Sequence, residues 1–474
     1  MDRITVTASG ELVSIDKDDN IIQYINYSAL ISASFVENIG HKYTEKTVDI
    51  GITDYSNELF IQYYVPQQEW KELSGNFDEL AISSGDSINQ LLWNDLISNS
   101  ADKLGVFRQF YFFFYFQLFL SIFAIWFISL FRRWVRGGLV LEPGCNFCIV
   151  RSKATEKKFN AIKDEFDLSL VYEDIVFKSD SMPSMLSCLS LFEIIKILPH
   201  LFRESIKDSR LISKELSSLF GDKAKFAIMS TYPSRIVLKV FYGFALKTIA
   251  LKSEVAKIYT GNKEDRFAMV EKQVAQSLNL MLVCIPHGLE YAFKFLGGVA
   301  GDKFYCTSSY SAELFSKIYP KTNSIFSSEL QTKLYSLSKS NDDKRNGKVV
   351  FFTESRGLEV NRKIISELYN SDISFSVRLH PKDLKSNYRD FRDLVFENDY
   401  IDSISNVICL ARKSTVLIEA LYNKSVAIAF IIDSKDAYYV SSVFPSLNDN
   451  TITKFSNIAD LFQFIKKLKG YRNV

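Results

Sequence analysis

The sequence predicts an α/β protein with two parallel-sheet domains, preceded by an acidic N-terminal region and one long aromatic helix. Three observations support this prediction. Short apolar runs alternate with amphipathic helical stretches from residue 146 onward, an uncharged aromatic run occupies residues 110–131, and the charge balance changes sign near that run. Such alternation is typical of parallel strands joined by crossover helices. The 474 residues suffice for two or three domains.

The overall composition is that of a globular protein. Apolar residues make up 47% of the chain and charged residues 24%, and the mean hydropathy is +0.00. These values exclude wholesale disorder, a collagen-like repeat and a many-spanning transporter. A net charge of +2 gives no support for a nucleic-acid partner. The six cysteines include one CxxC pair, Cys145 and Cys148, without a second pair or a nearby His, so we expect reduced thiols and no zinc site.

The near-zero net charge conceals two oppositely charged parts. Residues 1–105 hold 17 acidic and 6 basic side chains, a net −11, whereas the remainder holds 51 basic and 38 acidic side chains, a net +13. Such a difference in net charge indicates different surroundings or partners for the two parts of the chain. The first ten residues contain no apolar run of the kind found in secretion signals. We assign residues 1–105 as an acidic region of unknown role.

Residues 106–136 form a hydrophobic segment that we expect to contact a membrane. The run from Phe110 to Phe131 has 22 residues without a charge, long enough as a helix to cross a hydrocarbon core of about 30 Å. Twelve of the 22 are aromatic, and arginines follow at positions 132, 133 and 136. Aromatic side chains beside basic ones also fit a helix lying in the headgroup region, so spanning and interfacial modes both stay open. A buried core helix is the third alternative.

The two α/β domains are expected at residues 144–345 and 346–474. In the first, apolar runs predict strands at 147–152, 279–286 and 302–308, and helices at 155–165, 266–277 and 309–318. In the second, they predict strands within 348–355, 373–383, 405–415 and 425–431, a helix at 356–369 and a closing amphipathic helix whose apolar residues are Ile458, Leu461, Phe462, Ile465 and Leu468. The polar stretch at 339–348 is typical of an interdomain linker. No glycine-rich nucleotide-binding fingerprint is present, so ATP and NAD are not expected.

Polar residues follow the predicted strands, and ligands in open α/β sheets bind at the carboxyl ends of strands. In the first domain these residues are His287, Gly288 and Glu290. His is the usual general base near neutral pH, and glycine lets the backbone approach a ligand closely. The alternative is an ordinary turn after a buried strand.

In the second domain, His380 follows a strand directly, with Arg378 before it and Pro381 and Lys382 after it. An imidazole with cationic neighbours suits a phosphate leaving group. The alternative is a surface His in a turn formed by the proline.

Four further residues of the second domain are candidates. Ser414 and Thr415 lie at a strand-to-helix junction, where hydroxyls cap the helix and exposed N–H groups favour an anion. Glu419 lies within that helix and could reach a ribose hydroxyl, or it could lie on a solvated face. Glu354 ends the strand that opens the domain and is a candidate general base.

The order of these motifs resembles that of bacterial GT-B glycosyltransferases that build capsules, lipopolysaccharide and wall polymers from CMP- or CDP-activated donors. This group includes bacterial sialyltransferases, Kdo transferases and the glycerophosphotransferases of teichoic acid synthesis. The matching stretches are IPHGLEY (285–291), TSSYSAELF (307–315), VVFFTESRG (349–357), VRLHPKD (377–383) and ARKSTVLIEALYNKSVAIAF (411–430). The resemblance covers roughly residues 146–474. It implies a GT-B fold, with two Rossmann-like domains facing a cleft, the acceptor domain first and the nucleotide-sugar donor domain second.

The resemblance implies an inverting, metal-independent transferase without a cofactor. It would move a sialic acid or related nonulosonate from a CMP-sugar to a lipid-linked or surface glycan, such as a capsule, O-antigen or lipooligosaccharide. The expected location is the inner membrane, with the catalytic domains on the cytoplasmic face. His380, Ser414 and Thr415 would contact the donor phosphate, and Glu419 the nucleotide.

The general base has two candidates under this resemblance. The sialyltransferases often carry an acidic-acidic-Gly motif at this point, from which TESRG departs, and Glu354 is the corresponding residue. His287 corresponds to the HG element of the glycerophosphotransferases. The alternative functions are glycerophosphate transfer from CDP-glycerol, another hexosyl transfer in capsule synthesis, and a non-catalytic scaffold of a polysaccharide assembly complex.

Overall fold

A computed structural model describes most of the chain after residue 104. The described residues are 3–6, 12–15, 21–24, 55, 57, 58 and 104–470 except 230–231, 293, 296, 338–346, 355–357, 372, 433–435 and 438. Most of the acidic region, all but two residues of the linker expected at 339–348, and the three residues after Glu354 therefore lie outside the described residues. Near the N-terminus, β1 (Arg3–Val6), β2 (Leu12–Ile15) and β3 (Ile21–Tyr24) form an antiparallel sheet.

The first α/β domain contains a parallel six-stranded sheet in the order β5-β4-β6-β7-β8-β9. Its strands are β4 (Asn146–Val150), β5 (Leu168–Tyr172), β6 (Lys257–Thr260), β7 (Met281–Cys284), β8 (Lys303–Cys306) and β9 (Asn323–Phe326). Alternate residues of β4 enter different cores, because successive side chains of a strand point to opposite faces. Phe147 and Ile149 pack in the core shared with the long helices, whereas Cys148 and Val150 pack in the core that continues into the second domain.

Serine and aspartate residues begin the helices of this domain by accepting hydrogen bonds from backbone N–H groups. The cap residues are Ser152, Asp265, Ser308 and Ser327. The helices that they begin are α6 (Lys153–Ile162), α9 (Arg266–Ser277), α10 (Ser309–Ile318) and α11 (Ser328–Tyr335). Each helix therefore starts close to the carboxyl end of a parallel strand, as crossover connections require.

The second α/β domain contains a parallel five-stranded sheet in the order β11-β10-β12-β13-β14. Its strands are β10 (Val349–Phe352), β11 (Phe375–Arg378), β12 (Ile408–Ala411), β13 (Val426–Phe430) and β14 (Thr453–Phe455). The helices are α12 (Leu358–Tyr369), α13 (Tyr400–Ile404), α14 (Val416–Tyr422) and α16 (Ile458–Gly470), with short turns η6 (Lys385–Tyr388), η7 (Tyr439–Val443) and η8 (Pro445–Asn448). The prediction of an α/β fold with parallel sheets is confirmed.

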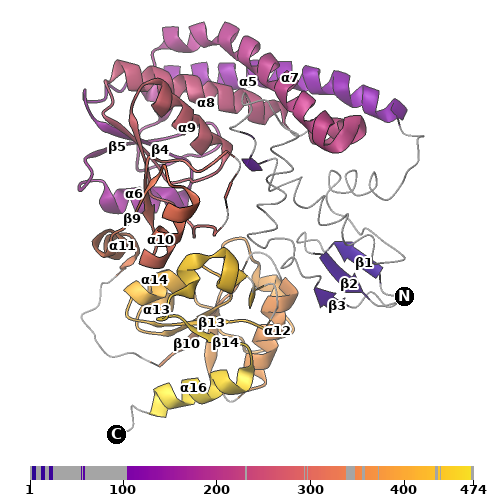
Figure 1. Cartoon of the computed structure of the whole chain (residues 1–474), viewed down its shortest axis with the longest axis vertical. Helices are drawn as coiled ribbons and strands as arrows, with labels where there is room; N and C mark the ends of the chain where they lie inside the picture. Colours follow the sequence, from indigo (N-terminus) through magenta and orange to yellow (C-terminus); the bar gives the residue numbers. More distant parts are fainter. Residues whose placement is uncertain are drawn as a thin grey trace.

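Three long helices pack on the first domain, at the opposite end of the molecule from the second domain (Figure 1). They are α5 (Leu104–Arg136), α7 (Leu191–Met229) and α8 (Pro233–Lys252), and the short turn η5 (Met185–Cys188) precedes α7. The aromatic segment lies in α5, which buries Phe114, Leu118, Ile122, Ile125 and Ser129 against its neighbours. Among the described residues, Phe112–Arg136 is the one helix long and apolar enough to cross a membrane by length and composition, and 28% of its most apolar window is buried.

The carboxyl-end segments of the two sheets contact each other. The backbone N–H of Ala292, after β7, donates to the carbonyl of Val443 in η7 at 2.8 Å. Asn423, at the end of α14, donates to the carbonyl of Tyr335 at 2.8 Å. The two domains are thus joined directly by described residues on both sides.

Candidate functional site

The strand order of each sheet reverses at a position where polar residues gather. In the first sheet the reversal lies between β4 and β6, and in the second it lies between β10 and β12. A crevice forms outside the carboxyl ends of strands at such a switch point, and ligands of α/β proteins bind there. Each domain therefore has one favoured position for a ligand.

His287 lies just beyond β7 with its imidazole held in one tautomer. Its Nδ1 is 2.8 Å from the carbonyl oxygen of Gly261, which can only accept, so Nδ1 carries the proton and Nε2 keeps its lone pair. The side chain is exposed. Partial burial of the ring, together with Lys263 and Lys158, lowers the pKa of His287 below 6.5 despite the bond to Gly261. A neutral imidazole with a free nitrogen has the properties of a general base.

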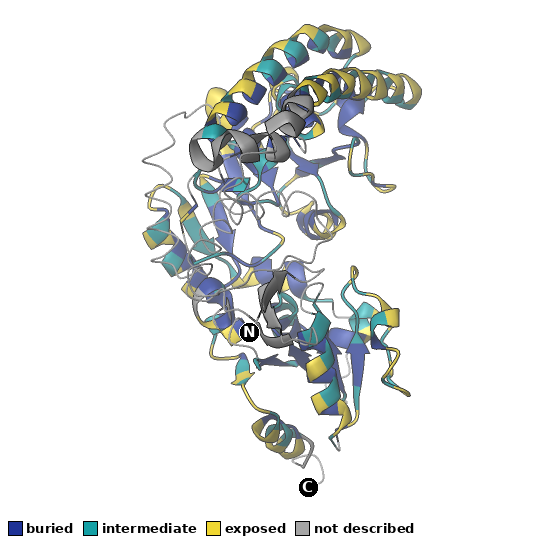
Figure 2. Cartoon of the chain, turned by 90° about the vertical axis from the view of Figure 1, so that its right-hand side faces the viewer, coloured by how far each residue is buried: buried dark blue, intermediate teal, exposed yellow. Residues whose placement is uncertain are grey.

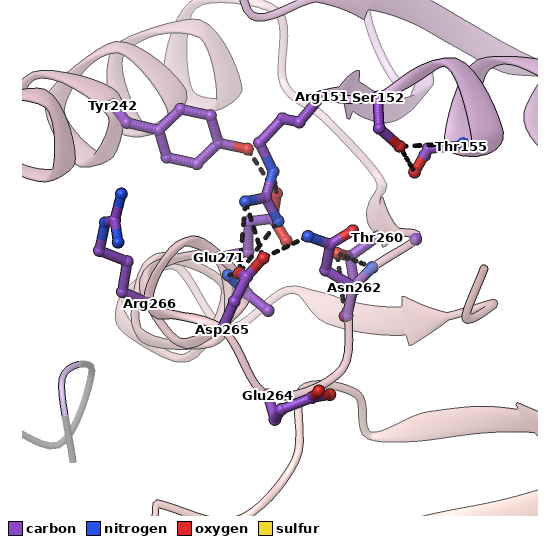
Figure 3. A network of polar contacts seen from close by, with 12 residues as sticks. Arg151, Ser152, Thr155, Tyr242, Thr260, Asn262, Glu264, Asp265, Arg266 and Glu271 are labelled. Atoms are coloured by element: carbon purple, nitrogen blue, oxygen red, sulfur yellow. Dashed lines mark hydrogen bonds and ion pairs between the residues drawn. The ribbon is translucent and has the colours of Figure 1, made fainter. Parts of the chain in front are cut away.

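The loop that carries Gly261 is held by an ionic network in which Glu271 is buried, Arg151 is mostly buried and Asp265 is partly exposed (Figure 3). Arg151, at the end of β4, donates to both carboxylate oxygens of Asp265 at 3.3 Å and lies 3.8 Å from Glu271. Asn262 and Tyr242 donate to Asp265 and Glu271. Arg151 lowers the pKa of Asp265 against the effect of burial, so this carboxylate stays ionised and its cap on α9 is kept.

A glycine is required in this loop at position 261, whereas the space at Gly288 is open. A Cβ on Gly261 would lie 2.6 Å from Cγ2 of Thr155 in α6, so only glycine allows the loop to approach that helix so closely. A Cβ on Gly288 would meet no atom within 4 Å. The space beside His287 is therefore open at Gly288.

A short piece of the acidic region is docked against the same loop. Asn57 donates to the carbonyls of Glu264 at 3.2 Å and Gly298 at 3.0 Å and accepts from the N–H of Gly297 at 2.8 Å. Glu58 pairs with Arg235 and Arg266, at 2.9 Å in each case. Part of the acidic region thus supports the loop that orients His287.

Glu290 is fully buried between the domains. Its carboxylate accepts from the N–H and hydroxyl of Thr307, both at 2.7 Å, and from the hydroxyls of Ser311 and Ser446 at 3.0 Å. Ser446 belongs to the second domain. The sequence predicted Glu290 as a residue on the acceptor side. In the structure, these donors occupy both of its carboxylate oxygens, and its bond to Ser446 joins the two domains.

Lys158 of α6 is a buried cation close to His287. Its ammonium donates to the carbonyl of Pro286 and to the hydroxyl of Tyr335, at 2.8 Å in each case. Burial lowers the pKa of Lys158 to about 8, although Glu419 and Glu290 act in the opposite direction. Its ammonium is one of the two cations that, after burial, lower the pKa of His287.

In the second domain, Glu354 belongs to a buried ion cluster. It accepts from the backbone N–H of Lys413 at 3.0 Å and lies 3.1 Å from the Lys413 ammonium. Arg412, 1% exposed, forms a two-pronged pair with Asp436, which Lys413 also contacts. Arg412 and Lys413 lower the pKa of Asp436 against the effect of burial. The Glu354 carboxylate is thus occupied by Lys413, whereas Nε2 of His287 has no hydrogen-bond partner among the residues that the structure describes.

His380 follows β11 with a defined tautomer of its own. Its Nδ1 accepts from the N–H of Lys382 at 3.1 Å, so Nε2 carries the proton and can donate. Partial burial and Lys382 lower the pKa of His380. Pro381 and Lys382 are exposed in the turn beside it. Arg378 is turned elsewhere, because its guanidinium donates to the carbonyl of Glu397 at 2.9 Å.

The remaining candidates lie around α14. The Ser414 hydroxyl accepts weakly from Val416 N–H at 3.4 Å, and the Thr415 hydroxyl makes no cap bond to the helix. Glu419 accepts from the hydroxyl of Tyr400 at 2.6 Å and faces Lys158 of the first domain. Ser414 and Thr415 adjoin the cluster of Glu354, whereas Glu419 lies at the domain interface.

Several residues of these arrangements were not predicted from the sequence. They are ordinary polar residues at positions without a motif, and no sequence signal marks their partners: Arg151, Asp265, Lys158, Asn57 and Asp436.

Among the described residues, no group of three His, Cys, Asp or Glu side chains converges as metal ligands would. A cavity of about 250 Å³ lies between the domains and is lined by Thr307, Ser308, Ser309, Phe326, Ile418, Leu421, Tyr422, Asp449 and Thr451.

Comparison of the sequence with models of known protein families gives no match, and no curated protein matches it.

Proposed function

We propose that the chain is an inverting glycosyltransferase of the GT-B type that moves a sialic acid or related nonulosonate from a CMP-sugar to a bacterial surface glycan. The observation that carries this proposal is the fixed tautomer of His287, with its free Nε2 at the carboxyl edge of the first sheet. The choice of CMP and of the sugar rests on the resemblance of the motifs. The acceptor would be a polysaccharide, O-antigen or lipooligosaccharide, attached to lipid at the cytoplasmic face of the inner membrane.

In this reaction, Nε2 of His287 removes the proton of an acceptor hydroxyl while that oxygen bonds to the anomeric carbon of the sugar. The bond from the anomeric carbon to the phosphate oxygen of CMP breaks, and the electron pair leaves with CMP. The Nε2–H of His380 would donate to the departing phosphate, and the hydroxyls of Ser414 and Thr415 would hold it. Glu419 would contact the nucleotide. The reacting groups belong to both domains, so transfer requires a cleft between them.

One observation favours a second candidate, the transfer of glycerol phosphate from CDP-glycerol. His287 is better placed as a base than Glu354, because Glu354 is paired with Lys413. With His287 as the base, the site would use the residue that corresponds to the HG element of the glycerophosphotransferases. In this candidate the acceptor oxygen attacks phosphorus and CMP again leaves.

The test is thermal stabilisation by CMP, CDP, UDP and GDP. We expect a selective rise in Tm with CMP, which His380→Ala abolishes and which the control variant His200→Ala, in α7, retains. A selective rise with UDP or GDP would identify an ordinary hexosyltransferase. Absence of any rise would favour the non-catalytic scaffold. Labelled CMP-sialic acid and CDP-glycerol then separate the two CMP-releasing reactions by their products.

A further inference from the structure

The outward side of α5 is an apolar face that no described part of the chain covers. Its exposed side chains recur along the whole helix, and Figure 2 shows exposed residues along the helices at the top of the molecule. Phe112 is 77% exposed, Phe127 64% and Trp134 71%. The other members of this aromatic face are Phe113, Phe116, Phe119, Leu120, Phe123, Ile128, Phe131 and Val135. Contiguous apolar patches of this kind mark interaction or membrane sites.

A row of exposed cations runs along α7 beside this face. The basic stripe consists of Lys196, Arg203, Lys207, Arg210 and Lys214. The acidic residues of the same part of α7, Glu193, Glu204 and Asp208, are half-buried or buried. At the start of α7, Phe192 and Ile195 are 62% and 50% exposed, so the apolar surface continues from α5 onto α7.

The contacts between the helices align the aromatic face with the basic stripe. Phe202 of α7 packs on Phe119 and Phe123 with ring centroids 5.8 and 5.4 Å apart, and the indole N–H of Trp126 donates to the carbonyl of Ile194. Because higher positions on α5 meet lower positions on α7, the two helices are antiparallel. The cation Arg203 is therefore level with the middle of the apolar run on α5.

This alignment decides between the two modes of membrane contact. If α5 crossed the bilayer, its packed partner α7 would carry Arg203 and Lys207 into the hydrocarbon, at a cost of several kcal/mol. If α5 lies in the plane of the membrane, its aromatic face enters the acyl boundary while the basic stripe meets anionic headgroups. Lys196 lies 4.0 Å above the ring of Phe192, an arrangement suited to the interface between oil and water.

We propose that α5 and the first half of α7 together form one interfacial binding face for an anionic phospholipid bilayer, and that α5 does not span it. This inference does not depend on the proposed transfer reaction. It orients the molecule with the first domain against the membrane and the second domain away from it. A lipid-linked substrate would then reach the first domain, while a soluble donor reaches the second.

The experiment is flotation of the full-length protein with vesicles of phosphatidylcholine, with and without phosphatidylglycerol. We expect binding to the anionic vesicles. The variant Phe116→Ser/Phe123→Ser/Phe127→Ser should lose binding to the anionic vesicles. The control Tyr369→Ser/Leu384→Ser/Val395→Ser, which changes exposed residues of the second domain, should bind as the wild type does.

The basic stripe has its own test. Lys196→Gln/Arg203→Gln/Lys207→Gln should weaken binding to anionic vesicles by about 100-fold, since each cation near an anionic surface contributes about a factor of five. The matched control Lys363→Gln/Arg389→Gln/Arg392→Gln removes the same charge from the second domain and should leave binding unchanged. An alkaline carbonate wash should release the wild type.

Three results would overturn the proposal. Retention after the carbonate wash would show that α5 spans. Failure of the wild type to float with the vesicles would show that the aromatic face does not bind a phospholipid bilayer. A dimer that dissociates in the triple Phe variant, without any flotation of the wild type, would assign the aromatic face to a second copy of the chain.

Discussion

Removal of the Glu290 carboxylate should weaken the joint between the two domains. The side chain is 0% exposed and accepts four hydrogen bonds, one from a backbone N–H and three from hydroxyls. In Glu290→Ala the hydroxyls of Thr307 and Ser446, already in contact, can pair with each other, but the Thr307 N–H stays buried without an acceptor. A buried N–H group without an acceptor lowers the free energy of unfolding by about 1–3 kcal/mol, and the loss of the hydrogen bonds to the charged carboxylate lowers it by a similar amount. We therefore expect a total loss of about 3–5 kcal/mol.

The assay is thermal unfolding followed by circular dichroism. At about 2–4 °C per kcal/mol, Glu290→Ala should lower Tm by about 6–20 °C. Glu290→Gln keeps one acceptor for the Thr307 N–H and should cost only about 1–2 kcal/mol. The control is Glu329→Ala, whose side chain is 78% exposed, with an expected change within about 0.5 kcal/mol. A Tm of Glu290→Ala equal to that of this control would refute the reasoning.

Three further predictions follow from the site. Burial and the cations Lys263 and Lys158 lower the pKa of His287 from its ordinary value of 6.5, so the acid limb of the pH–rate profile should be centred below pH 6.5; an acid limb centred above pH 6.5 would count against His287. Asp436→Ala removes the carboxylate that pairs with the buried Arg412 and with Lys413, while Glu354 stays 3.9 Å from Arg412. It should cost about 3 kcal/mol in urea unfolding, most of which Arg412→Met/Asp436→Leu should restore; equal stability of the single variant and the wild type would contradict the pairing. Asn57→Ala removes three hydrogen bonds from the loops around Glu264 and Gly298, so amide exchange there should accelerate, and unchanged exchange would show that the acidic region gives no support.

The regular α/β elements were accessible from the sequence because apolar runs and helical periodicity are local signals. The predicted strand at 147–152 overlaps β4 (Asn146–Val150), the predicted strand within 348–355 contains β10 (Val349–Phe352), and the predicted helix at 266–277 matches α9. The strands β5, β6, β9 and β14 and the helices α7 and α8 were not predicted. For α7 the reason is physical: it contains Pro199, and a proline inside a helical pattern usually indicates that a helix ends there.

The candidate site was predicted in part. His287 and His380 lie just beyond strand ends, as their positions in the sequence predict. The tautomer of each imidazole depends on a hydrogen bond that forms only in the folded chain. The burial of Glu290 and the pairing of Glu354 depend on residues far away in the chain, Ser446 and Lys413. Such long-range partners leave no trace in a single sequence.

The most direct test of the proposed function is transfer of labelled sugar from CMP-sialic acid to a glycan acceptor by the purified chain, wild type against His287→Gln. We expect incorporation by the wild type, and in the variant a loss of kcat of at least about 100-fold with the KM for the donor and the Tm unchanged. Normal turnover by His287→Gln would contradict the role of the imidazole as the base. Incorporation from CDP-glycerol with none from CMP-sialic acid would contradict the proposed donor.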